Sequence, residues 1–309
     1  MDRFETPVLF LLFNRPEMTA KTFSAIKQIQ PVTLYVSADG PRKDHPTDEY
    51  NCAEVRRIIQ EGVDWDCDLH MLFRDQNVGC GEAINSGISW FFKDVAEGII
   101  IEDDCLPHQD FFTFCDLLLE RYRDDDNVFM ISGNSVPKEY GKTLETDYCF
   151  TAVPSAWGWA TWRRSWEKYD FKLNNLDHFK EKNIIESIFT PKLYRRYWLE
   201  YFDEIKRNKI NNWDYQLAFT SFNNRGVCIR PKVNLISNLG TTLSNGTVVS
   251  TYDDEGLTIV KHPKIVSPDS QADKIIMQTL TSPIHRAKSL LKKLGWFYLI
   301  KKVLKKISK

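Results

Sequence analysis

The chain has 309 residues, of which 42% are hydrophobic and 27% charged, a composition that provides ample material for a globular core. This length predicts one large domain or two fused halves. The formal net charge of −1 argues against a bulk nucleic-acid binder, yet residues 284–309 carry nine basic residues and no acidic one. We therefore expect different partners for an acidic body and a basic tail.

The sequence indicates a protein of a reducing compartment. It has seven cysteines, an odd number, and no two of them show the C-x-x-C spacing of a structural zinc site. The first apolar run, Val8–Phe13, is too short for a signal peptide or a membrane span. No later run reaches the roughly 18 apolar residues of a spanning helix. We expect a cytoplasmic location.

Strands and helices are expected to alternate over the first 135 residues. Uninterrupted apolar stretches at 7–13 and 98–101 are typical of strands buried on both faces. The expected strands are 7–13, 32–37, 68–73, 98–101 and 127–132, and the expected helices are 17–29, 51–61, 81–93 and 109–122. This order implies an α/β fold with a mainly parallel sheet and helices on both faces. Ligands of such sheets bind beyond the carboxyl ends of the strands.

Residues 136–283 form a second half that is rich in aromatic side chains, with six tryptophans between residues 155 and 215. The expected helices are 192–207 and 213–223, and short strands are expected near 227–230 and 233–236. Asn245-Gly246 is a hairpin signal within a small, polar segment, 238–256, that predicts a lid. Because no repeat or linker separates them, halves 1–135 and 136–283 are expected to be fused.

Three consecutive carboxylates, Glu102, Asp103 and Asp104, come directly after a predicted buried strand. Like charges repel there, and a cation usually offsets the repulsion. A hard divalent ion such as Mn²⁺ or Mg²⁺ takes oxygen ligands and keeps open positions for diphosphate oxygens. The alternative is a solvated acidic turn, which is the interpretation that we adopt for 124–126 and 253–255.

Polar residues follow the other predicted strands as well. Arg15 follows the first strand, Asp39 the second, and Asn77 and Gly79 the third. Arginine can pair with phosphate, aspartate can accept from ribose hydroxyls or a base N–H, and glycine lets the backbone approach a ligand. Together with the acidic segment, these residues outline a nucleotide site at one edge of the sheet. Asp39-Gly40-Pro41 is also simply a good turn.

On these motifs the chain resembles the GT-A-fold nucleotide-sugar glycosyltransferases, in particular the branch typified by N-acetylglucosaminyltransferase I and its bacterial relatives. The matching segments, in order over about residues 7–240, are LFLLFNRPEMTAKTFSAI, SADG, IIIEDDCLPHQDFFTF, AWGWATW, NNWDYQ and CIRPKVNLISNLG. The resemblance implies a GT-A fold, with a Rossmann-like sheet that binds the nucleotide sugar and an aromatic-rich acceptor half.

The resemblance also implies roles for the donor-side residues. Arg15 and Asp39 would hold the nucleotide, with Asp39 near uracil or ribose. The Glu102-Asp103-Asp104 segment looks like the DxD motif of the family, with Asp104 as the metal ligand. The donor would be a nucleotide sugar, expected to be a UDP sugar, bound with Mn²⁺ or Mg²⁺.

Asp214 is similar to the catalytic base of the family. Such a base takes the proton of the acceptor hydroxyl while that oxygen attacks the anomeric carbon from the face opposite the diphosphate, which inverts the configuration. The alternative for Asp214 is a carboxylate stabilised at a helix N-terminus. Trp157, Gly158 and Trp159 would line the donor-sugar and acceptor pocket. The other tryptophans, Trp162, Trp166 and Trp198, we interpret as core residues.

The basic tail contains two amphipathic pieces, one over 284–294 and one beginning at Trp296. Their apolar faces point in nearly opposite directions, so a break at Gly295 is expected. One piece would then pack on the body and the other on an anionic bilayer. The alternative is a helix docked on its own domain or on a second subunit.

These observations lead to one expectation and two alternatives. The expected protein is a metal-dependent, inverting glycosyltransferase that extends a saccharide or lipid-linked saccharide in bacterial surface-glycan synthesis. It would work at the inner face of the cell membrane, with no nucleic-acid partner. The alternatives are a sugar-phosphate nucleotidyltransferase and a non-catalytic carbohydrate-binding module.

Overall fold

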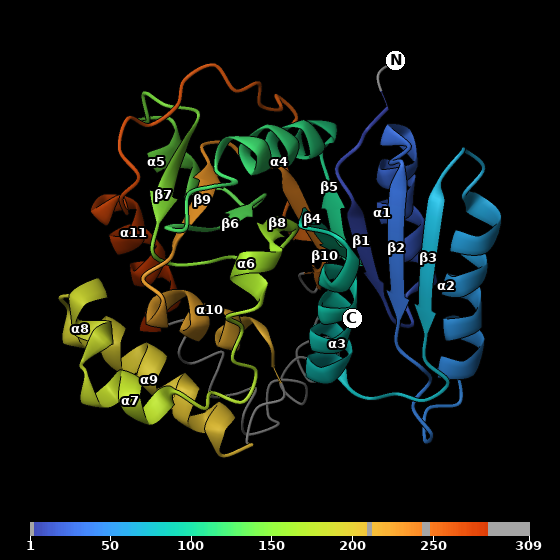
Figure 1. Cartoon of the computed structure of the whole chain (residues 1–309), viewed down its shortest axis with the longest axis horizontal. Coiled ribbons are helices and arrows are strands. Elements are labelled where there is room, and N and C mark those ends of the chain that lie inside the picture. Colours follow the sequence, from blue (N-terminus) through green and yellow to red (C-terminus); the bar gives the residue numbers. More distant parts are fainter. Residues whose placement is uncertain (1–2, 209–211, 243–247, 284–309) are drawn as a thin grey trace, which may run out of the picture.

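The computed structural model describes residues 3–208, 212–242 and 248–283, without the side chains of 241–250 (Figure 1). One eight-stranded sheet runs through both halves of the chain. From one edge to the other, its strands are β3 (Asp68–Phe73), β2 (Thr33–Ala38), β1 (Val8–Leu12), β4 (Glu97–Glu102), β8 (Trp159–Trp162), β6 (Val128–Ser132), β9 (Val227–Pro231) and β7 (Tyr148–Thr151).

The first half has the parallel βαβ architecture that the sequence predicts, because β3, β2, β1 and β4 all pair in parallel. The connecting helices are α1 (Pro16–Ile29), α2 (Asp48–Gly62) and α3 (Cys80–Asp94), and α4 (Gln109–Arg121) follows β4. Residues of β1 alternate between two cores: Phe10 packs with α1, α2 and α4, whereas Leu9 packs with α3. The helices therefore cover both faces of the sheet.

The sheet departs from the predicted series at β8, which the sequence did not suggest. This strand lies antiparallel between β4 and β6, so the two parallel strands are not neighbours. β7 was also missed and pairs antiparallel with β9 at the far edge. The cause is tertiary packing: Trp159 and Trp162 of β8 are fully buried against residues distant in sequence.

Helices gather beside the second half of the sheet (Figure 1). They are α5 (Lys138–Gly141), α6 (Arg163–Trp166), α7 (Leu176–Glu181), α8 (Ile184–Ile188), α9 (Lys192–Lys206), α10 (Asp214–Asn223) and α11 (Ser270–Leu280). Those from α7 onward share a third core, which includes Trp198, Phe219 and Met277. The predicted core tryptophans Trp162, Trp166 and Trp198 are confirmed as buried.

A small second sheet adjoins the acidic segment. It consists of β5 (Cys105–Pro107), β10 (Ile236–Thr242) and β11 (Val248–Ser250), all antiparallel. The strand expected at 233–236 is wrong for its first three residues, because the N–H of Asn234 donates to Asp253 instead of a strand partner. The expected lid is anchored at 236–242 through β10, and its tip around Asn245 lies outside the described residues.

The basic tail, 284–309, likewise lies outside the described residues. Over the part of the chain that the structure describes, no helix combines the length and the apolar character needed to cross a bilayer.

Candidate functional site

A cleft of about 980 Å³ opens beside the carboxyl end of β4, between the two halves of the chain. Its lining includes Glu102 and Asp104 from the acidic segment, Trp157 from the loop before β8, and Asp214 from the start of α10. The structure thus brings four predicted site residues, separated by more than a hundred positions in the sequence, to one cavity of the size that small ligands use.

Arg15 supplies the positive charge that the acidic segment requires. Its Nη1 atom lies 3.1 Å from Oδ1 of Asp103 and 2.8 Å from Oδ2 of Asp104. The second oxygen of Asp103 accepts the N–H of Phe13 at 3.3 Å. Burial raises the pKa of Glu102 well above its ordinary value, and the charges of Asp104 and Asp103 add to this effect. The prediction that these strand ends meet is therefore confirmed, with an arginine as the neighbouring cation.

In the part of the chain that the structure describes, Asp104 is one of four acidic residues that line the cleft, together with Glu102, Asp214 and Asp253, and carboxylate oxygens are ligands that Mg²⁺ and Mn²⁺ accept. Within the described residues, no three His, Cys, Asp or Glu side chains come together as a complete metal site. A Mg²⁺ or Mn²⁺ ion held by one carboxylate, with substrate phosphates and water as its other ligands, does fit this donor set. Arg15 donates to Oδ2 of Asp104, so a bound ion and the guanidinium would share this carboxylate.

The predicted contact of Asp39 with a nucleotide stays a prediction, and the structure shows which protein groups its carboxylate binds. Its side chain is buried, and its carboxylate accepts the N–H groups of Gly40 and Val78 and the amide of Asn77, at 2.8, 3.1 and 2.8 Å. These bonds tie the end of β2 to the loop after β3. Gly79 has a φ of 87°, a conformation that favours glycine, at the start of α3. The hydrogen bond between Asp39 and Asn77 thus helps to fix the two loops that follow β2 and β3 at this edge of the sheet.

Asp214 faces the cleft from the first turn of α10. Its Oδ1 atom accepts the N–H of Tyr215 at 2.9 Å, so the stabilising helix-terminal contact of the alternative interpretation is present. Burial raises the pKa of the Asp214 carboxyl, although this hydrogen bond opposes the rise. Its charge also acts on Glu102 and Cys80 across the cleft. A raised pKa makes the Asp214 carboxylate a stronger base than an ordinary aspartate, which suits it to accept a proton.

The tryptophan motif divides between the cleft and the core. Trp157 is 36% exposed and lines the cleft. Trp159 does not line it, which corrects the prediction: the side chain is 1% exposed and its ring lies 6.0 Å from that of Trp213. Gly158 has a φ of 57°, and a Cβ there would lie 2.3 Å from Ile236. The glycine turns the chain between an exposed and a buried tryptophan.

Sequence reasoning missed Arg230, a buried cation on the cleft wall. Its guanidinium makes five hydrogen bonds of 3.2–3.3 Å to four uncharged oxygens, on Asn134, Ser135, Val153 and Pro154. It therefore holds together two loops that line the cleft. A signal was available, because Arg230 is the single charged residue in the otherwise apolar strand VCIRP.

Two further lining residues correct or extend the predictions. Asp253 is not part of a freely solvated turn: Lys138 lies 2.5 Å from its carboxylate, which is 18% exposed, and both residues line the cleft. Cys80, at the start of α3, also lines it, and burial raises the pKa of its thiol to about 11. The solvated-turn interpretation holds for Asp124 and Asp126, which are exposed.

No protein-family model and no curated protein sequence matches this chain. Among solved structures, S. aureus TarS residues 1–349 is 12% identical with a TM-score of 0.40, over 72% of this chain and 57% of that one. Apo UDP-glucose pyrophosphorylase is 10% identical, with a TM-score of 0.38 over 78% and 95%. HddC from Yersinia pseudotuberculosis is 11% identical, with a TM-score of 0.27 over 41% and 56%. Identities and TM-scores this low do not identify the function of the chain, which must come from the residues of the cleft.

Proposed function

We propose that the protein is an inverting glycosyltransferase of the GT-A type. It would transfer a sugar from a nucleotide sugar, a UDP sugar in this proposal, to a hydroxyl of a saccharide or lipid-linked saccharide. The observation that carries the proposal is the shared cleft, in which Asp214 lies across from the acidic end of β4. A transfer of this kind needs a base for the acceptor and a charged site for the donor diphosphate, and the cleft offers both.

On the donor side, Arg15 and the acidic segment would receive the diphosphate. Arg15 is half-exposed and can pair with phosphate oxygens, because its contacts with Asp103 and Asp104 use only one of its nitrogens. Asp104 would hold Mn²⁺ or Mg²⁺, which when bound neutralises charge on the leaving diphosphate. Asp39 and Asn77 would keep the two adjoining loops in place beside the nucleotide.

On the acceptor side, Asp214 would remove the proton from the attacking hydroxyl. Its raised pKa keeps it a stronger base than an ordinary aspartate. Trp157 presents an exposed aromatic ring at the same cleft, a surface on which a sugar ring can stack. The base and the aromatic ring come from different elements that line the same cleft, and Arg230 binds the loop that leads to Trp157 through the carbonyl oxygen of Pro154.

Asp214→Asn tests this function. With the full chain, Mn²⁺ and a panel of UDP sugars, turnover of the active donor should fall by about 10²–10⁴, the usual scale for a lost general base. UDP affinity, measured by calorimetry, should stay unchanged. Asp126→Asn, in an exposed turn, is the matched control and should behave like the wild type. Turnover by Asp214→Asn close to the wild-type rate would show that Asp214 is structural.

The same assay separates the alternatives. A sugar-phosphate nucleotidyltransferase would release pyrophosphate from a nucleoside triphosphate and a sugar phosphate. A carbohydrate-binding module would bind saccharides without consuming any nucleotide sugar. Our proposal requires nucleoside diphosphate release that depends on an acceptor.

The location at the inner face of the membrane is also a proposal, and it depends on the sequence of the basic tail, 284–309. Flotation with vesicles containing about one-third anionic phosphatidylglycerol should carry the full chain upward, by the electrostatic attraction of basic segments to anionic lipid. A chain ending at Pro283 should stay at the bottom. Equal flotation of both chains would contradict this location.

A further inference from the structure

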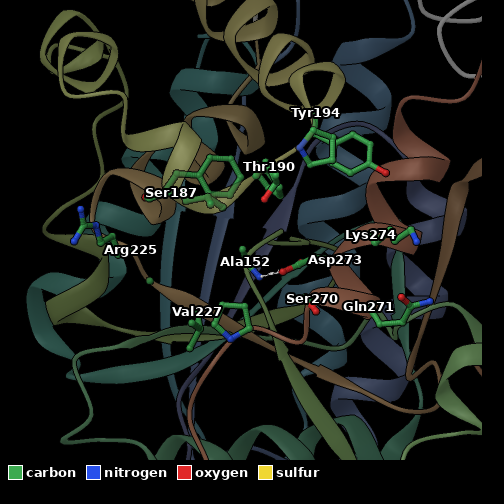
Figure 2. Close-up of a pocket in the computed structure, with 16 residues that line it drawn as sticks. Ala152, Ser187, Thr190, Tyr194, Arg225, Val227, Ser270, Gln271, Asp273 and Lys274 are labelled. Carbon is green, nitrogen blue, oxygen red and sulfur yellow. Dashed lines mark hydrogen bonds between the residues drawn. The ribbon is translucent and has the colours of Figure 1, made fainter.

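A second cavity, of about 600 Å³, lies apart from the cleft (Figure 2). It is formed by the α8–α9 turn, the α10–β9 turn and the first residues of α11. None of its lining residues lines the cleft, although α9 and α11 contribute to both. The volume lies in the range of cavities that hold small organic molecules.

The inner wall of this second cavity is apolar and partly aromatic. Phe189, Tyr194 and Phe222 are buried side chains that line it, and Val227 at the start of β9 adds an aliphatic surface. Ser187 and Thr190 provide hydroxyl groups on exposed positions. A ligand here would bury a ring or hydrocarbon body against this wall, with polar groups toward the opening.

The charged residues of the second cavity leave an excess of positive charge. Arg225 and Lys274 are exposed and lie on opposite sides of the cavity in Figure 2, and their side chains make no hydrogen bond or ion pair with any residue that the structure describes. Asp273 is the one acid of the lining. Its carboxylate accepts the N–H groups of Ala152 and Val153, at 3.0–3.2 Å. The positive charge of Arg230 also favours the ionised form of this carboxyl, because it acts to lower its pKa.

The backbone at Arg225 supports a role for its side chain. Arg225 has a φ of 52°, the left-handed conformation, at the turn that follows α10. Helices commonly end with glycine in this conformation, because other residues are strained there. The glycine of this turn is at position 226, one residue later. The strained position itself is occupied by Arg225, whose long cationic side chain lies at the opening of the cavity.

We propose that the second cavity binds a small organic anion, a carboxylate, sulfonate or phosphate on a ring-bearing or hydrocarbon body. The apolar wall takes the body, and the anionic group pairs with one of the two cations at the opening, Arg225 on one side or Lys274 on the other. This site is independent of the transfer reaction proposed for the cleft, so either proposal can fail while the other stands.

The test uses a matched pair of fluorescent probes on the full chain. 8-Anilinonaphthalene-1-sulfonate is an aromatic anion, and N-phenyl-1-naphthylamine is its uncharged counterpart. The double variant Arg225→Glu/Lys274→Glu should bind the anion at least tenfold more weakly and bind the neutral probe within twofold of the wild type. The matched control Lys21→Glu/Lys43→Glu changes two exposed lysines elsewhere by the same charge, and should leave both affinities within twofold.

A second variant locates the probe. Thr190→Trp places a large ring at an exposed lining position and should weaken both probes at least tenfold, whereas Trp157→Ala in the cleft should not. Unchanged binding of the anion by Arg225→Glu/Lys274→Glu would overturn the proposal. So would a probe signal that disappears in Trp157→Ala and persists in Thr190→Trp.

Discussion

Replacing Arg230 with methionine should destabilise the protein more than removing an exposed arginine. The change deletes five hydrogen bonds and leaves two carbonyl oxygens, on Ser135 and Pro154, without their donor, whereas Val153 still accepts from Thr151 and Asn134 from Ser155. An unsatisfied buried acceptor costs about 1–3 kcal/mol. At the lower end of this range, which suits groups beside a cleft that water can enter, the sum for the two carbonyl oxygens is about 2 kcal/mol.

The measurement is the free energy of unfolding from urea titrations at 25 °C. Arg123→Met is the matched control, because Arg123 pairs with Glu97 through two hydrogen bonds but is 54% exposed. Exposed pairs are worth about 0–1 kcal/mol. Arg230→Lys should fall between the two methionine variants, since an ammonium keeps the charge and has fewer donors. If Arg230→Met loses no more stability than Arg123→Met, the argument that Arg230 holds the cleft wall is refuted.

Three further predictions concern separate parts of the molecule. Asp104→Asn should abolish the increase in UDP affinity caused by Mn²⁺ while keeping the melting temperature, and calorimetry with and without Mn²⁺ would show an unchanged increase if Asp104 is no ligand. Gly158→Ala should cost about 1–3 kcal/mol in urea titrations, because its Cβ would meet Ile236 at a positive φ; an unaffected midpoint would contradict this. Burial raises the pKa of Asp273 to about 6, so the folded state retains a proton that the unfolded state loses near pH 4. Between these values stability should fall as pH rises, by up to about 3 kcal/mol, and Asp273→Asn should lack this component; identical pH profiles would disprove it.

The sequence predicted most of the first half because local patterns dictate it. Apolar runs such as 7–13 are typical of strands buried on both faces, and the predicted helices between them have apolar residues at helical spacing. The same reasoning placed Arg15, Glu102 and Asp104 at one edge, since parallel strands end together. It did not reveal that Arg15 pairs with the acidic segment itself, which depends on side-chain geometry rather than on topology.

The rest depended on contacts between distant residues. Asp39 looks like a ligand-binding residue in sequence, yet its partners Asn77 and Val78 lie almost forty positions away. Trp157 and Trp159 are two residues apart in one motif, and packing against residues such as Trp166 and Trp213 decides that the second is in the core. Asp253 sits in a polar loop that looks solvated until Lys138 is found beside it.

The insertion of β8 between β4 and β6 has a consequence for how the chain folds during synthesis. The first four parallel strands, β3-β2-β1-β4, are complete once residue 102 has left the ribosome, and their contacts are close in sequence. The next strand of this sheet to emerge is β6, but its neighbours β8 and β9 follow only at 159–162 and 227–231. Because local contacts form sooner than distant ones, the N-terminal half should assemble first with the edge of β4 open. The edge of β4 is covered only when β8, Trp159–Trp162, has been synthesised and pairs with it. These four residues therefore join two folding units as well as the two halves of the sheet.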